Sequence, residues 1–218
     1  MINKKYISKF YSFIGYTSIE IIELLKIDIN PKSKSLYSKL TKEILGELYL
    51  EELKAEGYVL KSVRLNSNQT PMEAISFPAF KYQNMMNTDW LESELFLHLN
   101  KKYLFIFYSQ ENYSVKLNCI REWKIKKNDL EIAKNTWLIV KELIKNGNIV
   151  KEIKRGKRIT NFPKASKQGI IHVRPHASNS NDTFKLPIKD KKTNLEEYTK
   201  HSFWLNKDFI KNKILLNE

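Results

Sequence analysis

Two groups of residues in this sequence have side chains suited to chemistry on a phosphodiester. Mg²⁺-dependent hydrolysis needs clustered carboxylates to hold the ion and a lysine to orient water. Glu52-Leu53-Lys54 is a literal Glu-x-Lys, but it lies in a charged stretch that favours a helix, where positions i and i+2 point apart. On the strand expected next, Lys61 interrupts an apolar stripe. It fits either a lysine that meets a phosphate or a surface lysine whose stem covers apolar residues.

The second group is a dense run of cations at 151–167. Residues 151–218 hold 16 Lys and Arg against 7 Asp and Glu, whereas the first 150 residues hold 22 against 17, and the whole chain carries +14. Such a concentration is typical of a segment that binds a polyanion, with nucleic acid favoured over a solvated face or an acidic protein partner. The cations expected to contact phosphates are Lys154, Arg155, Lys157 and Arg158.

Polar residues then gather in one short loop, and a tryptophan follows further along the chain. Arginine and asparagine make bidentate contacts to bases in the DNA major groove, while asparagine equally holds a loop through a local turn. Both roles stay open for the two asparagines. The candidate base-reading residues are Arg174, His176, Asn179, Asn181 and Thr183, with Trp204 as a brace that packs on the loop and makes an indole hydrogen bond.

Several other kinds of site are excluded or disfavoured. The six glycines form no dinucleotide or Walker-type phosphate loop, and Cys119 is the single cysteine, so no internal disulfide or cysteine zinc finger exists. His172 and His176 have a zinc-like spacing, but Pro175 keeps them off one helix, and we expect no metal site. No apolar run approaches the roughly 20 residues that span a bilayer, and no signal peptide is present. We therefore expect a cytoplasmic protein with no membrane partner.

The elements that must position these residues follow from hydrophobic spacing and turn signals. Past residue 151 the chain is expected to be rich in loops. The pattern predicts an α/β (α+β) fold in which a mixed sheet is flanked by helices, with an N-terminal helical arm at 1–48 and a domain at 49–218. Helices are expected at 17–25, 36–48, 89–99, 128–146 and from 207, and strands at 58–65, 73–77, 103–108, 115–125 and 170–173. Thr17 and Glu20 have the spacing of a capping box at the start of the first helix. The helix at 128–146 is expected to carry one apolar stripe, formed by Leu130, Ala133, Trp137, Val140 and Ile144.

Five short segments occur in one order within about residues 50–215: LKSVRL (60–65), ISFPAFKY (75–82), NFPK (161–164), HVRPHA (172–177) and FWLN (203–206). Together they resemble the GATC-cutting endonucleases, which include the mismatch-repair nicking enzyme MutH and the Sau-type type II restriction enzymes. The greatest likeness is to the second, C-terminal domain of the restriction enzyme. The resemblance implies a restriction-endonuclease-like fold whose active site is an Asp followed by Glu-x-Lys, with Mg²⁺ as cofactor.

The resemblance also assigns residues. It places Lys61 at the lysine position and Val59 at the glutamate position, and the upstream carboxylate falls near Glu52. Glu52 and Lys61 would thus be a degenerate remnant of a catalytic site, with no bound metal, or Mg²⁺ if the chain is active. The base-reading loop of the family maps onto Arg174-Pro175-His176, and its aromatic pair maps onto Phe203-Trp204.

Three functions remain open at this point. The leading one is specific binding of a GATC-type site in double-stranded DNA, as the inactive effector domain or subunit of a type II restriction system. A catalytic endonuclease domain or subunit, or a second copy of this chain, would then be its partner. The alternatives are an active Mg²⁺-dependent endonuclease that uses Glu52, Lys61 and a carboxylate such as Glu73, and a protein-interaction module whose interface is the arm 1–48.

Overall fold

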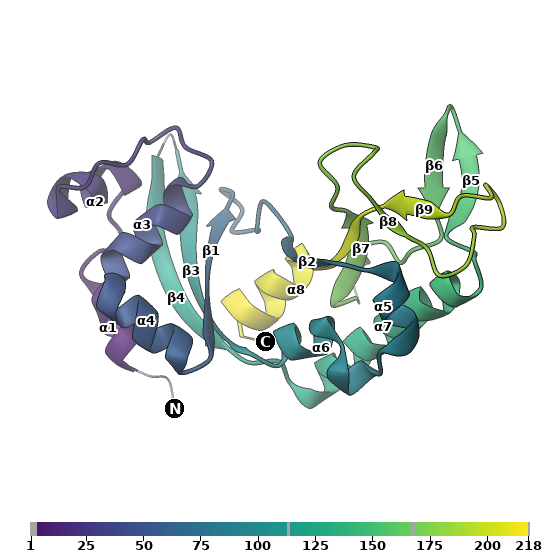
Figure 1. The fold of residues 1–218 in the computed structure, drawn as a ribbon. Coiled ribbons are helices and arrows are strands. Elements are labelled where there is room, and N and C mark those ends of the chain that lie inside the picture. The colour runs from purple at the N-terminus through teal and green to yellow at the C-terminus, as the bar shows by residue number, and fades with distance from the viewer. Residues whose placement is uncertain (1–3, 113, 167–168, 218) are drawn as a thin grey trace. The chain divides into compact units, whose positions relative to one another are not determined.

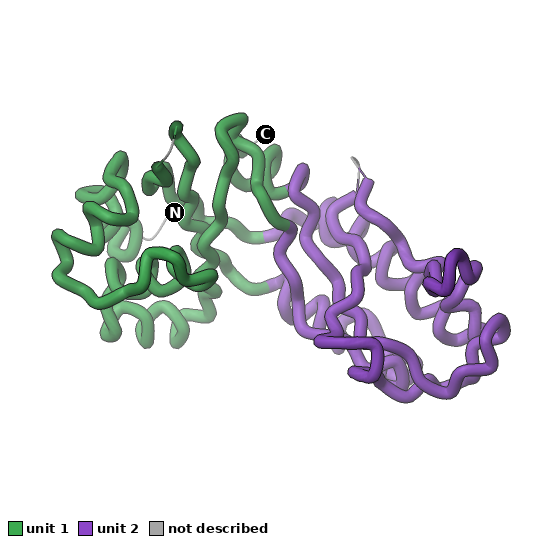
Figure 2. The backbone as a smooth tube through the Cα atoms, turned by 90° about the horizontal axis from the view of Figure 1, so that it is seen from above, with its two compact units in different colours: residues 1–73, 101–124, 210–218 green, residues 74–100, 125–209 purple. Residues whose placement is uncertain are grey.

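The computed structural model describes residues 4–112, 114–166 and 169–217. Contacts between Cα atoms divide the chain into two compact units (Figure 2). Unit 1 comprises residues 1–73, 101–124 and 210–218, and unit 2 comprises residues 74–100 and 125–209. Both units are discontinuous in sequence, so each one is formed by segments that lie far apart along the chain.

Unit 1 is built on a three-stranded mixed sheet of order β1-β3-β4 (Figure 1). Strand β1 (Tyr58–Leu65) runs parallel to β3 (Lys102–Glu111), which pairs antiparallel with β4 (Ser114–Trp123). The continuous apolar run in β3 is buried from Tyr103 to Tyr108, as a central strand requires. The predictions of strands at 58–65, 103–108 and 115–125 are confirmed.

Four helices pack on one face of this sheet: α1 (Lys4–Tyr11), α2 (Ser18–Leu25), α3 (Leu36–Leu45) and α4 (Glu47–Ala55). The capping box at the start of α2 is confirmed, because Glu20 N–H donates to Thr17 Oγ1 at 3.2 Å and Thr17 N–H donates to Glu20 Oε2 at 2.7 Å. The single helix expected at 36–48 is instead two helices. Gly46, whose φ is +81°, turns the chain between them.

Unit 2 contains an antiparallel sheet of order β2-β10-β7, formed by β2 (Ile75–Phe80), β10 (His201–Leu205) and β7 (Ile171–Pro175). Its long helix α7 (Lys127–Lys145) buries four residues of the expected stripe, namely Ala133, Trp137, Val140 and Ile144, while Leu130 is half-buried. The segment after β2 forms α5 (Tyr82–Asn87), η1 (Trp90–Glu92) and α6 (Glu94–Leu99), so the helix expected at 89–99 is broken. Ser93 caps α6, since its Oγ accepts from Phe96 N–H at 3.2 Å.

Two small hairpins complete unit 2, and both lie where the sequence pattern predicts loops. Strands β5 (Val150–Lys154) and β6 (Lys157–Thr160) form the first, and β8 (Thr183–Lys185) and β9 (Glu197–Thr199) form the second. The region past residue 151 was expected to be rich in loops, and these two hairpins are regular structure that the sequence pattern did not indicate. The chain ends with α8 (Lys207–Phe209) in unit 2 and the π-helix η2 (Ile210–Leu215) in unit 1.

The molecule is thus a mixed α/β protein of small sheets flanked by helices, which agrees with a restriction-endonuclease-like α+β fold. The structure groups the helices before residue 48 with the sheet of unit 1, and the division of the chain at residue 48 stays a prediction. Within the described residues, no helix has the length and apolar character needed to cross a membrane.

Candidate nucleic-acid interface

The β5–β6 hairpin carries the four cations that were predicted to contact phosphates. Arg155 and Gly156 form its two-residue turn with φ values of +50° and +72°, which is the left-handed pair that tight hairpins favour. Lys154 and Lys157 lie directly opposite each other across the strands. Like charges in that position destabilise a hairpin. Among the described residues, no carboxylate forms an ion pair with any of these four cations.

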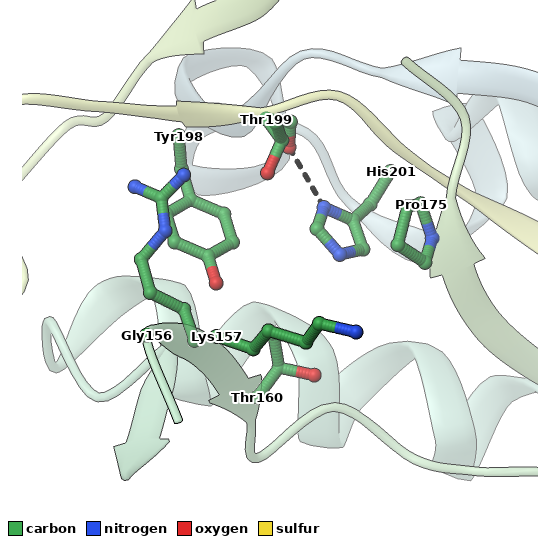
Figure 3. A pocket seen from close by; sticks show the side chains of 8 residues that line it. Gly156, Lys157, Thr160, Pro175, Tyr198, Thr199 and His201 are labelled. Atoms are coloured by element: carbon green, nitrogen blue, oxygen red, sulfur yellow. Dashed lines mark hydrogen bonds between the residues drawn. The ribbon is translucent and has the colours of Figure 1, made fainter. Parts of the chain in front are cut away.

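The hairpin is attached to the rest of unit 2 at its base. Val150 N–H donates to Asp190 Oδ2 at 2.9 Å, and Asn161 N–H donates to the Ile149 carbonyl at 2.9 Å. The Arg158 guanidinium lies 4.8 Å from the centroid of the buried Tyr198 ring (Figure 3). A cation over an aromatic face is held by attraction to the ring electrons. The cations are therefore fixed on a hairpin with an anchored base.

Arg174, His176 and Trp204 come together in unit 2, as the resemblance implies. Arg174 in β7 pairs with Ser202 of β10, so its guanidinium reaches Trp204 two residues along and lies 4.9 Å from the indole centroid. The His176 ring is 5.8 Å from the same indole. Arg174 and His176 are exposed, whereas Trp204 is half-buried. A stacked guanidinium keeps its N–H edges free for a bidentate acceptor.

The expected role of Trp204 is confirmed in one respect and wrong in another. Its ring packs beneath Arg174 and His176, as predicted. Its indole N–H is buried and has no hydrogen-bond acceptor in the described structure, so the predicted indole hydrogen bond is not formed. Trp204 acts here through its ring face alone.

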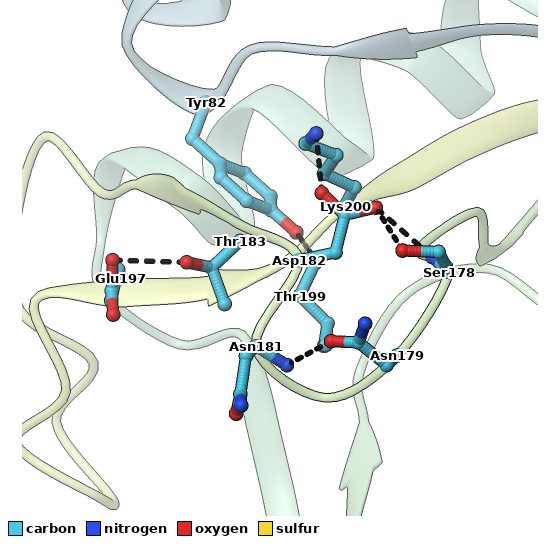
Figure 4. A network of polar contacts seen from close by, with 9 residues as sticks. All are labelled: Tyr82, Ser178, Asn179, Asn181, Asp182, Thr183, Glu197, Thr199 and Lys200. Atoms are coloured by element: carbon cyan, nitrogen blue, oxygen red, sulfur yellow. Dashed lines mark hydrogen bonds and ion pairs between the residues drawn. The ribbon is translucent and has the colours of Figure 1, made fainter.

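The loop after β7 is held by Asp182, which sequence reasoning missed (Figure 4). The Asp182 carboxylate forms an ion pair with Lys200 and accepts from Ser178 N–H at 3.0 Å and Ser178 Oγ at 3.2 Å. These donors, Lys200 first, hold the pKa of the Asp182 carboxyl below its usual value. His176 N–H also donates to the Lys200 carbonyl at 2.8 Å. The loop is thus tied to the strand segment that leads into β10.

The structure places the remaining loop candidates in different roles. Asn179 holds the loop, because its Oδ1 accepts from Asn181 N–H at 2.9 Å in a local turn. Asn181 itself is exposed at the loop tip. Thr183 Oγ1 donates to Glu197 Oε2 at 2.9 Å, so this hydroxyl ties β8 to β9. Asn181 Oδ1 accepts from Ser180 Oγ at 3.4 Å, so this side chain also takes part in a local contact.

Two buried residues near the hairpin were also missed by sequence reasoning. His201 is 2% exposed, and its Nδ1 lies 2.7 Å from the Thr199 carbonyl, to which it donates. Burial lowers the pKa of His201 to about 4, so the ring is neutral at physiological pH. Tyr198 stacks beside it, with the ring centroids 5.5 Å apart. Sequence spacing gave no signal for either residue, because buried and exposed positions do not alternate regularly along 197–205.

Lys61 lies in unit 1, on the sheet face away from the helices. Its neighbour Ser62 points toward the helices, since Ser62 Oγ lies 2.8 Å from Thr41 Oγ1 of α3. Side chains alternate along a strand, so Lys61 points to the opposite face, beside Phe105 of β3. Its amine has no hydrogen-bond or ion-pair partner among the described residues, and burial lowers its pKa.

Glu52 is not brought to Lys61. It lies in α4, on the helix-covered side of the sheet, and its carboxylate pairs with Lys5 Nζ of α1 at 2.5 Å. Glu73, the carboxylate considered for an active enzyme, pairs with Arg64 at 3.0 Å. Each of the two acids is already matched with a cation.

The donor set around Lys61 does not fit a magnesium ion. Val59 and Val63 share its strand face, and they offer no oxygen ligand where Mg²⁺ requires carboxylates. Over the whole of the described chain, no three His, Cys, Asp or Glu side chains are grouped so that they could hold a metal ion. We therefore derive no metal-dependent step from these residues.

The mixed α/β fold agrees with a restriction-endonuclease-like protein, and comparison with known proteins supports a relationship to restriction enzymes. The chain is 29% identical over 214 residues to the type II restriction enzyme Sau3AI of Staphylococcus aureus. The match covers 85% of this chain and 42% of that enzyme, so the chain spans about two fifths of its relative's length. No family model matches the chain. This chain is accordingly related to a type II restriction enzyme.

Proposed function

We propose that this chain binds double-stranded DNA and recognises a GATC-type site, as a catalytically inactive effector domain or subunit of a type II restriction system. Unit 2 supplies the contacts. The hairpin cations bind backbone phosphates, which positions the protein without reading sequence. Arg174 and the loop 176–182 then read base edges.

The observation that carries this proposal is the arrangement of Arg174 on Trp204. An arginine fork stacked on an aromatic ring loses little conformational entropy when it binds a planar acceptor pair such as guanine O6 and N7. Here the fork lies 4.9 Å from the indole centroid and is exposed. The loop beside it is fixed by Asp182, so the reading group has a defined place.

The relationship to Sau3AI supports a role in a restriction system. The match covers two fifths of that enzyme, which is consistent with a separate partner that supplies the remaining part. The catalytic chemistry would come from an endonuclease domain or subunit outside this sequence, or from assembly with a second copy. The inactive state is supported by Val59 at the glutamate position and by the separation of Glu52 from Lys61 across the sheet.

The test is a gel-shift titration of the full chain on a GATC duplex and on a duplex with that site scrambled. The same samples are then incubated with Mg²⁺ and run on a cleavage gel. We expect tighter binding of the GATC duplex and no cleavage of either DNA. Binding without preference would remove the GATC assignment, and cleavage would favour the active endonuclease. Failure to bind either duplex would favour an interaction module that uses residues 1–48.

A further inference from the structure

A small pocket lies between the basic hairpin and the ends of β7 and β9 (Figure 3). Its volume is about 330 Å³, at the small end for ligand sites, so it suits a compact group. One wall is the hairpin, and the floor is formed by Tyr198 and His201, each 2% exposed. The lining residues are Gly156, Lys157, Arg158, Thr160, Pro175, Tyr198, Thr199 and His201.

The lining is suited to an anion. It contains two cations and no carboxylate. Lys157 has no hydrogen-bond or ion-pair partner among the described residues, and the same holds for the hydroxyls of Thr160 and Thr199. The pocket lining therefore offers an ammonium, a guanidinium and two hydroxyls, which are groups that donate to the oxygens of an anion.

The pocket is poorly suited to an extruded base. Recognition of an unstacked base relies on a free aromatic face. The ring of Tyr198 already has the Arg158 guanidinium over it at 4.8 Å and the His201 ring stacked beside it at 5.5 Å. A tetrahedral group with several acceptor oxygens needs no such face, and it would meet the cations of the hairpin wall.

We propose that this pocket binds a single phosphate group, and that in the DNA complex this group is one phosphodiester of the duplex backbone. This inference rests on the proposed function for its source of phosphate. The inference adds to the proposed function one defined phosphate contact, which is distinct from the general electrostatic attraction between the hairpin and DNA. Lys154 and Arg155 at the hairpin tip contribute to that general attraction, while Lys157 and Arg158 also hold the one seated phosphate.

The hairpin offers a matched control for the test. Lys154 lies directly opposite Lys157, is exposed like it and does not line the pocket. Lys157→Gln and Lys154→Gln remove the same charge from adjacent positions. Diffuse electrostatics would make the two substitutions equivalent, whereas a built phosphate site would not.

The first arm uses inorganic phosphate as the probe and no DNA. Amide NMR signals of the full-length protein are followed during a phosphate titration, with chloride at equal ionic strength as the reference. We expect saturable shifts at Thr160, Thr199 and His201 in the wild type and in Lys154→Gln, and loss of saturation in Lys157→Gln. Absence of saturable shifts, or equal loss in both variants, would overturn the phosphate pocket.

The second arm uses GATC duplexes in which one phosphate at a time is replaced by a neutral methylphosphonate. We expect one position where the replacement weakens wild-type binding about tenfold, as a charged hydrogen bond is lost. That position should remain sensitive in Lys154→Gln and become insensitive in Lys157→Gln. A uniform small loss at every position would contradict a seated phosphodiester.

The two arms distinguish this inference from the proposed function. If inorganic phosphate saturates the pocket but no duplex binds, the proposed function fails and DNA is rejected as the source of the phosphate. If the GATC duplex binds specifically but neither arm identifies the pocket, the function stands and the phosphate pocket is rejected.

Discussion

Arg174 lies on the Trp204 ring, and this contact fixes the direction of its fork. We expect Arg174→Ala to weaken binding to GATC DNA by about 1–3 kcal/mol and binding to scrambled DNA much less. Arg174→Lys keeps the charge but loses the fork, so it should also lose the preference. Gel-shift titrations on both duplexes check this. Equal weakening on both would make Arg174 a phosphate contact.

The Trp204 ring packs against Arg174 and His176, whereas its indole N–H has no acceptor among the described residues. A buried donor without an acceptor costs about 1–3 kcal/mol, so Trp204→Phe should keep the stacking surface without loss of stability. Trp204→Ala removes the surface under Arg174 and should relax the GATC preference. Thermal unfolding and the two-duplex titration together test the pair. Loss of preference in Trp204→Phe would show that the indole N–H has a partner in the DNA complex.

Asp182 fixes the reading loop through its charge. Because its folded pKa is lowered, its contribution is complete above the unfolded value of about 3.9 and is lost as the pH falls through the folded value. Asp182→Asn should therefore speed amide hydrogen exchange in residues 176–183 at neutral pH and weaken the GATC preference. In the wild type, the protection of the same amides, after correction for the intrinsic pH dependence of exchange, should fall only under acidic conditions. Unchanged exchange in the variant would mean that the backbone contacts of the loop suffice.

At the scale of the element, the β5–β6 hairpin contains the Lys154–Lys157 pair, whose like charges destabilise it. Among the described residues, no ion pair of the hairpin cations offsets this repulsion. Each phosphate contact should contribute about −0.9 to the slope of log affinity against log salt. Replacing all four cations (Lys154, Arg155, Lys157 and Arg158) with alanine should make that slope shallower and weaken both duplexes alike. Affinity measured over a salt series is the check. A selective loss on the GATC duplex would assign base reading to the hairpin.

At the scale of the whole molecule, the residues proposed as a catalytic remnant belong to unit 1 and the proposed DNA-reading residues belong to unit 2. Glu52 is paired with Lys5, and the resemblance places Val59 at the glutamate position. The chain alone should therefore show negligible Mg²⁺-dependent cleavage in a gel assay. Val59→Glu restores one ligand and should not suffice, because a metal site needs its full ligand set and their supporting contacts.

A single result would overturn the inactive assignment. Cleavage by the unmodified chain that Lys61→Ala abolishes would promote the active endonuclease. Lys61→Met is the companion variant, because it removes a partly buried, unpartnered amine and should preserve or raise stability. Loss of cleavage in both variants, with folding intact, would assign the amine to catalysis.

The sequence by itself determined much of the local structure. Hydrophobic spacing gave β1 at its observed bounds and the buried stripe of α7, and the Thr17–Glu20 pair marked the start of α2. These features depend on neighbours within a few residues, so their signals lie in short windows of sequence. The concentration of charge in 151–218 is also visible in the sequence, whereas the grouping of Arg174 and His176 with Trp204 was implied by the family resemblance and not by local spacing.

Only the tertiary structure decided which residues meet. The hairpin at 150–160 has exposed strands with no apolar alternation, so its pattern is that of a loop, and its register became visible only through pairing. The Asp182–Lys200 ion pair joins residues 18 positions apart, and the pocket joins three segments that are at least 15 positions apart. Two further findings also depend on how elements pack. The Trp204 indole N–H has no acceptor among the described residues, and Glu52 and Lys61 lie on opposite sides of a sheet. Burial and pairing at such separations depend on how elements pack, which local spacing does not encode.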